Sequence, residues 1–194
     1  MRAYLIGLLV ALAVLGCAPA DRGWHVKSIA GLMPDLSFAM TDDQGRAVGG
    51  QDYRGGTVLL FFGYSHCPDE CPATLARLAQ AVAAMKAGAT DVRVLFVTVD
   101  PQRDTESQLQ SYMRSFGPEF VGLRGTPSQL AALAKRYRVT YSLGKPDAGG
   151  DYEVTHSDAV FVFDQTGRAR LLIRPEDPVS SITADLERLS TGQR

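Results

Sequence analysis

The stretch TVLLFFGYSHCPDECP, residues 57–72, contains a strand, a turn and the start of a helix. Residues 57–64 form a short apolar run that is rich in β-branched and aromatic side chains, which predicts a buried central strand. Apolar residues recur at helical spacing over residues 72–86, so a helix is expected there. Cys67 and Cys71 therefore lie where a buried strand gives way to a helix.

Strand and helix patterns alternate along the rest of the chain. The remaining strands are expected at 36–40, 92–99, 159–163 and 169–173, and the remaining helices at 105–116, 127–137 and 178–189. The last two strands are separated by the turn sequence Asp164-Gln165-Thr166-Gly167, which predicts a hairpin near the C-terminus. This order, with cysteines after the first central strand, indicates an α/β, thioredoxin-like three-layer fold. It has a mixed central β-sheet, helices on both faces and a late β-hairpin.

Composition narrows the class of protein. The 194 residues suffice for one domain with a substantial core. Lys plus Arg number 20 and Asp plus Glu number 21, giving a formal net charge of −1. A nucleic-acid-binding domain needs a basic surface, so no nucleic-acid partner is expected.

The N-terminus resembles a bacterial lipoprotein signal. Residues 5–15 are apolar or small, a stretch too short to cross a bilayer, and Gly16 precedes Cys17 at the expected cleavage point. We therefore expect a lipoprotein signal peptide at 1–16, lipid attachment at Cys17, a lipid-anchored tether at 17–33 and the thioredoxin-like domain at 34–194. The expected location is extracytoplasmic, on the bacterial membrane facing the periplasm. An uncleaved anchor and a plain secretory signal are the alternatives, and both also place the domain outside the cytoplasm.

The two remaining cysteines indicate chemistry rather than structural cross-linking. A disulfide between Cys67 and Cys71 closes a very small ring and constrains the unfolded chain little. A helix start lowers the pKa of a nearby thiol, and thiolate is the form that binds metals and attacks disulfides. Three residues separate the cysteines, one more than in a redox thioredoxin motif, so both sulfurs can converge on a soft metal ion.

A third ligand is expected from one of three histidines. His25 falls in the predicted tether and is expected to be solvated. His66 adjoins Cys67, where tuning of the thiolate or simple packing is favoured over direct ligation. His156 precedes the predicted hairpin strand, and in thioredoxin-like folds that loop lies against the Cys motif, so His156 is the candidate ligand. A solvated loop histidine is the alternative.

Three separated segments resemble the Sco/SenC family of copper proteins. They are FFGYSHCPDECPATLARL, VTVDPQRDTESQL (97–109) and YEVTHSDAVFVFDQTGR (152–168), and the likeness extends from Pro34 to about Leu189. Family members bind copper through two Cys and one His, which the resemblance places on Cys67, Cys71 and His156. The resemblance thus implies a Cu(I) site and leaves Cu(II) binding open.

The same resemblance implies a copper chaperone. Its partners would be the cytochrome c oxidase subunit with the binuclear copper centre, an upstream copper donor, and the membrane through the N-terminal lipid. A thiol–disulfide oxidoreductase that reduces the target's cysteines before metallation is the main alternative. A peroxidase of related fold is disfavoured because Tyr64 stands where it needs Thr or Ser. Zinc is disfavoured because no fourth ligand is evident.

Two acidic residues follow the second central strand. Asp100 ends that strand and is a candidate for a supporting contact to a ligand or a partner; a turn-capping carboxylate is the alternative. Arg103 and Asp104 are expected to form a structural ion pair with each other.

Overall fold

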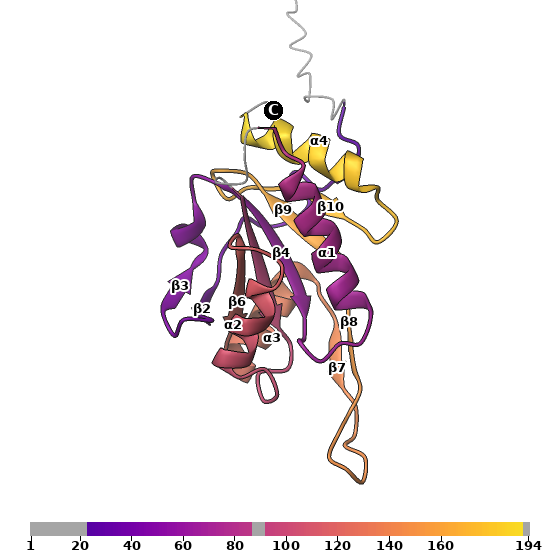
Figure 1. The fold of residues 1–194 in the computed structure, drawn as a ribbon. Coiled ribbons are helices and arrows are strands. Elements are labelled where there is room, and N and C mark those ends of the chain that lie inside the picture. The colour runs from indigo at the N-terminus through magenta and orange to yellow at the C-terminus, as the bar shows by residue number, and fades with distance from the viewer. Residues whose placement is uncertain (1–22, 87–91, 192–194) are drawn as a thin grey trace, which may run out of the picture.

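The central sheet runs through the whole domain (Figure 1). The computed structural model describes residues 23–86 and 92–191, and within them one eight-stranded sheet has the order β1-β10-β9-β4-β5-β6-β2-β3. Its strands are β1 (Lys27–Ser28), β2 (Ala39–Asp42), β3 (Ala47–Gly49), β4 (Thr57–Gly63), β5 (Val92–Thr98), β6 (Phe120–Arg124), β9 (Val160–Phe163) and β10 (Ala169–Ile173). Strands β4, β5 and β6 are parallel, whereas β9 pairs antiparallel with β4, so the sheet is mixed as expected.

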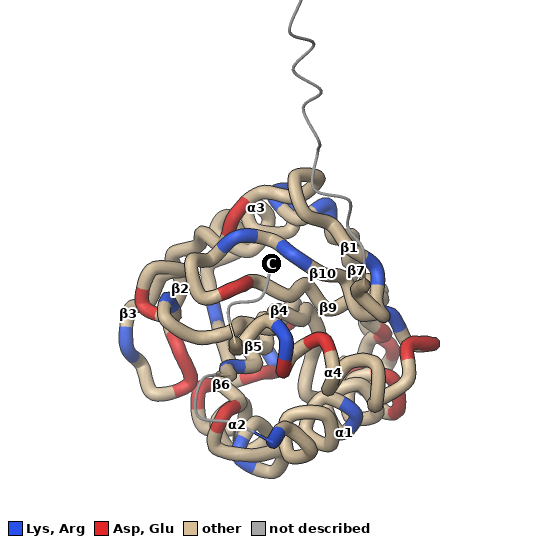
Figure 2. Tube along the Cα trace, turned by 90° about the horizontal axis from the view of Figure 1, so that it is seen from above, with Lys and Arg blue, Asp and Glu red and all other residues tan. Residues whose placement is uncertain are grey.

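Helices cover both faces of this sheet. They are α1 (Glu70–Ala83), α2 (Glu106–Arg114), α3 (Pro127–Tyr137) and α4 (Val179–Ser190), with a short 3-10 helix at Gly50–Tyr53. Figure 2 shows the sheet between α3 on one side and α1, α2 and α4 on the other. The prediction of a three-layer α/β fold is confirmed.

Aromatic side chains fill both interfaces between helices and sheet. Phe61 of β4 and Phe96 of β5 are register partners and pack against each other with ring centroids 5.9 Å apart. Side chains alternate along a strand, so Phe161, the partner of Leu60, lies on the opposite face. There it packs against Tyr137 at the end of α3, with a centroid distance of 5.6 Å. Strand β4 is consequently buried along its whole length, which explains its continuous apolar run.

Two hairpins lie near the C-terminus. The predicted one is confirmed: β9 and β10 pair antiparallel across a turn in which the Asp164 carboxylate accepts backbone N–H bonds from Thr166 and Arg168. A second hairpin was not predicted. It consists of β7 (Tyr141–Leu143) and β8 (Val154–His156), which form a separate two-stranded sheet and project beyond the start of α1 (Figure 1).

The N-terminal segment differs from the expected tether. The signal sequence and Cys17 lie outside the described residues, but from Gly23 onward the chain packs on the domain. Strand β1 covers the edge of β10, and the flanking Val26 and Ile29 are buried. His25 is not simply solvated either, because its Nδ1 lies 2.9 Å from the Asp185 carboxylate. Among the described residues, no helix combines the length and the apolar character that crossing a bilayer requires.

Candidate metal centre

The cysteine loop, residues 64–69 between β4 and α1, folds back onto the start of α1. After β4 ends, the Cys67 N–H donates to the Tyr64 carbonyl, and α1 begins at Glu70 with Cys71 in its first turn. The Cys71 N–H donates to Cys67 Sγ at 3.4 Å. A free N–H at a helix N-terminus therefore points at the first sulfur, as the sequence predicts. Cys67 lies before the helix, so helical spacing does not bring the two sulfurs together. The curled loop instead carries Cys67 toward Cys71.

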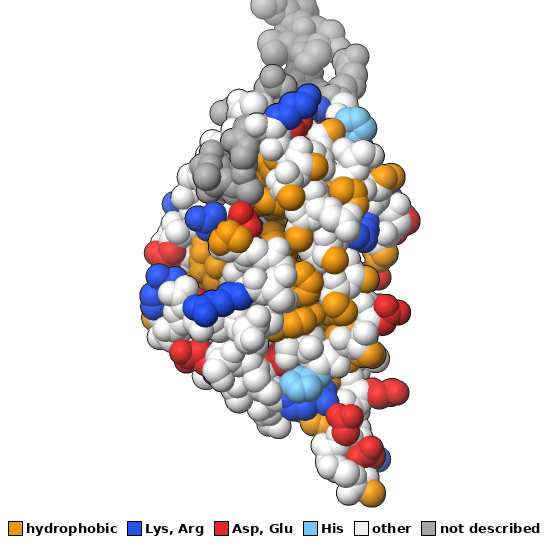
Figure 3. All heavy atoms as spheres, viewed as in Figure 1, with side chains coloured by type: hydrophobic (Ala, Val, Ile, Leu, Met, Phe, Trp, Pro, Cys, Tyr) orange, Lys and Arg blue, Asp and Glu red, His pale blue; other side chains and the backbone are white. Residues whose placement is uncertain are grey.

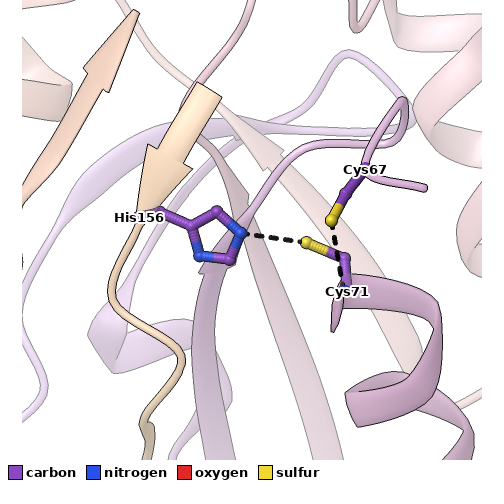
Figure 4. Close-up of side chains that lie close together, drawn as sticks. All are labelled: Cys67, Cys71 and His156. Atoms are coloured by element: carbon purple, nitrogen blue, oxygen red, sulfur yellow. Dashed lines mark hydrogen bonds between the residues drawn. The ribbon is translucent and has the colours of Figure 1, made fainter. Parts of the chain in front are cut away.

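His156 reaches this loop from the end of β8. Figure 4 shows its ring directed at the cysteine pair, with Nε2 3.2 Å from Cys71 Sγ. Its Nδ1 lies 3.0 Å from the Ser157 carbonyl, which can only accept, so Nδ1 carries the proton and Nε2 presents a lone pair. The rings of Phe61 and Tyr64 contact the imidazole edge to face, each at a centroid distance of 5.9 Å. The imidazole is thus held in both position and tautomer.

Burial sets the protonation state of the second cysteine. Cys71 is fully buried, and this burial raises the pKa of its thiol well above the ordinary value. The expected lowering at a helix start is therefore wrong for Cys71, because loss of solvation outweighs the helix N–H groups. The buried thiol is protonated at neutral pH and donates to His156 Nε2. Cys67 is half-buried, and both cysteines are free thiols.

Asp104 holds the cysteine loop in place, a role that the sequence analysis missed. Its fully buried carboxylate accepts bonds from the Ser65 N–H at 3.0 Å, the Ser65 hydroxyl at 2.5 Å and the Thr98 hydroxyl at 2.5 Å. It therefore ties the loop before Cys67 to the end of β5.

His66 is turned toward Asp104 rather than toward the sulfurs. Its Nδ1 lies 3.4 Å from the Asp104 carboxylate and 3.2 Å from the Ser65 hydroxyl. Its side chain is 43% exposed. Within residues 23–86 and 92–191, the residues that converge as candidate metal ligands are Cys67, Cys71 and His156, without His66.

Asp100 supports a different part of the site. Its buried carboxylate binds the Arg103 guanidinium and accepts a bond from the Tyr152 hydroxyl at 2.7 Å. The expected ion pair between Arg103 and Asp104 is wrong, because Arg103 turns to Asp100 while Asp104 faces the cysteine loop. Within the described part of the chain, Asp100 bonds to Thr98, Arg103 and Tyr152 and not to the three converging residues, so it acts on them only through its neighbours.

The three side chains form a donor set suited to a soft metal ion. The two sulfurs and the imidazole nitrogen lie within 4.8 Å of one another. Metal–sulfur bonds of ~2.3 Å separate the ligand atoms of a three-coordinate ion by about 4 Å. Thiolate and imidazole ligands together favour Cu(I) or zinc, and zinc prefers a fourth ligand. The described residues offer no fourth side chain in this group.

Comparison with known proteins agrees with these features. The mitochondrial protein SCO2 homolog of Bos taurus is 42% identical over 132 residues. That match covers 67% of this chain and 50% of the relative, so the chain spans about half the length of the curated relative. The structure of Bradyrhizobium japonicum ScoI with copper bound is 35% identical with a TM-score of 0.73, covering 80% of this chain and 98% of that one.

A structure without metal is also similar. The apo Sco1 protein from Thermus thermophilus is 33% identical with a TM-score of 0.76, covering 88% of this chain and 99% of that chain. The family model for SCO1/SenC matches residues 33–191, which include both cysteines and His156. The chain belongs to the SCO1/SenC family.

Proposed function

We propose that this protein binds one Cu(I) ion through Cys67, Cys71 and His156. The proposal rests on the convergence within 4.8 Å of two sulfurs and an imidazole whose Nε2 presents a lone pair. Copper-bound relatives with the same fold support the choice of metal. Binding displaces the proton that Cys71 shares with His156, because the metal takes the thiolate.

The ion is cargo rather than a resident cofactor. We propose that the protein delivers it to the binuclear copper centre of cytochrome c oxidase during assembly, after receiving it from an upstream donor. Two similar ScoI structures hold copper, and a further solved protein of this fold is described as a member of the Sco family of cytochrome c oxidase assembly proteins, which supports this role. Three ligands gathered beside the start of a helix, two of them half-buried, suit an ion that must be passed on.

A transfer assay tests the delivery role. Copper-loaded protein is mixed with the copper-free soluble domain of the oxidase subunit, and the optical spectrum of the binuclear centre is followed. We expect transfer from wild type and little from His156→Ala, which should not hold the ion. His66→Ala is the matched control and should transfer copper normally, because His66 adjoins Cys67 but is not one of the converging residues. Absence of transfer from fully loaded wild type would contradict the delivery role while leaving copper binding intact.

A reductase role is the second candidate. The half-buried Cys67 is the more accessible of the two sulfurs and is the candidate nucleophile. The Cys71 sulfur lies within 4.8 Å of it, close enough to resolve a mixed disulfide. Attack of the Cys67 thiolate on the target disulfide would form a mixed disulfide and free one target thiol. Cys71 would then attack Cys67 Sγ, which forms the Cys67–Cys71 disulfide and frees the second target thiol, so the protein is oxidised as the target is reduced. Copper-free wild type should reduce an oxidised target domain if this role holds. Cys71→Ser would then accumulate the mixed disulfide.

We also propose that Cys17 carries a lipid that holds the protein on the bacterial membrane, facing the periplasm. The Gly16-Cys17 junction after an apolar segment supports this placement. The first described segment lies at the α4 end of the domain, and the β7–β8 hairpin projects from the other end (Figure 1). A tether at that end would present the metal centre away from the membrane. Radiolabelled fatty acid should label wild type and not Cys17→Ser.

A further inference from the structure

We propose that Arg103 is a positioning residue that holds the β7–β8 hairpin, and with it His156, against the cysteine loop. Its consequence for copper affinity rests on the function proposed above. Its effect on the hairpin does not, because the contacts exist in the metal-free protein. Arg103 lies between the two segments that carry the candidate ligands and contacts both.

The inner contacts of Arg103 anchor it to the domain. Its Nε donates to the buried Asp100 carboxylate at the end of β5. The same carboxylate accepts the Tyr152 hydroxyl at 2.7 Å, and the guanidinium lies over the Tyr152 ring at 3.9 Å from its centroid. Tyr152 comes two residues before β8. These contacts therefore fix the start of the strand that ends at His156.

The outer contact reaches the hairpin from its exposed side. Arg103 Nη1 donates to the Asp151 carboxylate at 2.5 Å, and the Asp151 side chain is 77% exposed. Acidic side chains gather on this hairpin in Figure 3, and they include exposed Asp147, Asp151 and Glu153. An exposed ion pair contributes little on its own, so the inner contacts should dominate.

Arg103 also contacts the cysteine loop through Tyr64. The guanidinium carbon lies 5.7 Å from the centre of the Tyr64 ring, and this ring packs edge to face on His156. A single guanidinium thus links the end of β5, the hairpin and the first residue of the cysteine loop. Lysine cannot replace it, since one ammonium group lacks the planar stacking surface and the fixed fork of donors.

Positive charge alone offers a competing explanation. An arginine near two thiolates favours their charged form and would raise copper affinity without positioning anything. If Arg103 acts by positioning, its effect on copper affinity depends on His156, and its removal loosens the hairpin even in the metal-free protein. A charge effect alone predicts neither result. These two differences decide between the explanations.

The first test is hydrogen–deuterium exchange of the metal-free protein. Arg103→Ala should speed exchange of the peptide covering residues 141–157 by about tenfold or more, while the peptides of β4 and β5 keep their protection. Arg46→Ala is the matched control, because Arg46 also pairs with a buried carboxylate, Asp42, in the turn between β2 and β3. Unchanged exchange of residues 141–157 in Arg103→Ala would overturn the proposal.

The second test is a double-mutant cycle on Cu(I) affinity. Arg103→Ala should weaken binding about tenfold, the lower end for residues that orient metal ligands, and Arg103→Lys should restore little of it. In the His156→Ala background the same change should have no further effect. An equal loss in both backgrounds would establish the charge effect and refute positioning. If Arg103→Ala fails to fold, Tyr152→Phe removes the hydroxyl contact to Asp100. That variant must then show faster exchange of residues 141–157 and a loss of Cu(I) affinity that depends on His156.

A failure of the proposed function looks different from a failure of this inference. Wild type that binds no Cu(I) would refute the function, yet the exchange experiment would still report on the hairpin. Wild type that binds Cu(I) with an Arg103-independent hairpin would refute the inference alone.

Discussion

Gly63→Ala should weaken copper binding without touching a ligand atom. Gly63 ends β4, and a methyl group added there would lie 2.8 Å from Cys71 Sγ and 2.7 Å from Phe96 Cε2. Restoring ordinary contact at 3.4 Å or more requires the sulfur to move by about 0.6 Å, the difference between 3.4 and 2.8 Å. A metal site tolerates changes of only ~0.2 Å in its bond lengths. We therefore expect Cu(I) affinity to fall about tenfold or more.

The fold should survive this change. Gly63 does not have a positive φ, so an alanine fits the backbone, and overpacking of this kind costs about 1–3 kcal/mol of unfolding free energy. Gly122→Ala is the control, because its added methyl would meet Leu109 Cγ at 2.3 Å in the β6–α2 interface. It should lose stability and keep copper affinity. Competition with a chromophoric Cu(I) chelator, together with urea unfolding, gives both quantities. Wild-type affinity in folded Gly63→Ala would refute the reasoning.

Four further results are expected. Because burial raises the pKa of Cys71, copper must displace its proton. Chelator competition should therefore show apparent affinity rising by at least about tenfold per pH unit in the neutral range. The neutral thiol's contribution to apo stability is present below the ordinary pKa of 9.0 and should be lost as pH rises above it, as thermal melts can check. Asp104→Asn puts an amide against buried donors and should cost about 2 kcal/mol or more in urea unfolding, and also weaken copper binding. Removing residues 1–33 should cost about 3 kcal/mol through loss of buried Val26 and Ile29, whereas removing 1–22 leaves β1 in place; melts of the two truncations compare them.

The central part of the fold was predictable because its signals are local. Long apolar runs predict β4 and β5 to within one residue, and the helical pattern over residues 127–137 predicts both ends of α3. The predicted limits of β10 also match, since its alternation is bounded by a clear turn. The predicted strand at 36–40 is shifted to 39–42, because pairing with β3 and β6 rather than local pattern decides where β2 runs.

Several strands could not be predicted because they are short and depend on their partners. The edge strand β1 has two residues and exists by pairing with β10. Strands β7 and β8 have three residues each, separated by a polar loop, and stabilise one another. The expectation that His156 would approach the cysteines came from fold likeness rather than from a local pattern. The hairpin supplies its structural basis.

The supporting residues of the site show the same limit. The sequence places Asp100, Arg103 and Asp104 beside each other, which suggests pairing between neighbours. Asp100 and Arg103 do pair with each other, but their further partners, Tyr152 and Asp151, are distant in the chain. Asp104 turns instead to Ser65. Which carboxylate serves which segment depends on how the turn after β5 meets the cysteine loop and the hairpin, and only the folded chain defines that.

Cu(I) titration of the domain containing residues 23–194, with a competing chelator, tests the central claim most directly. The account predicts one tightly bound copper per chain, ligated by two sulfurs and one nitrogen in X-ray absorption spectra. It also predicts a loss of affinity of about tenfold or more in His156→Ala and unchanged binding in His66→Ala. Binding that is equally tight in His156→Ala, or a wild-type ion with sulfur ligands alone, would contradict it.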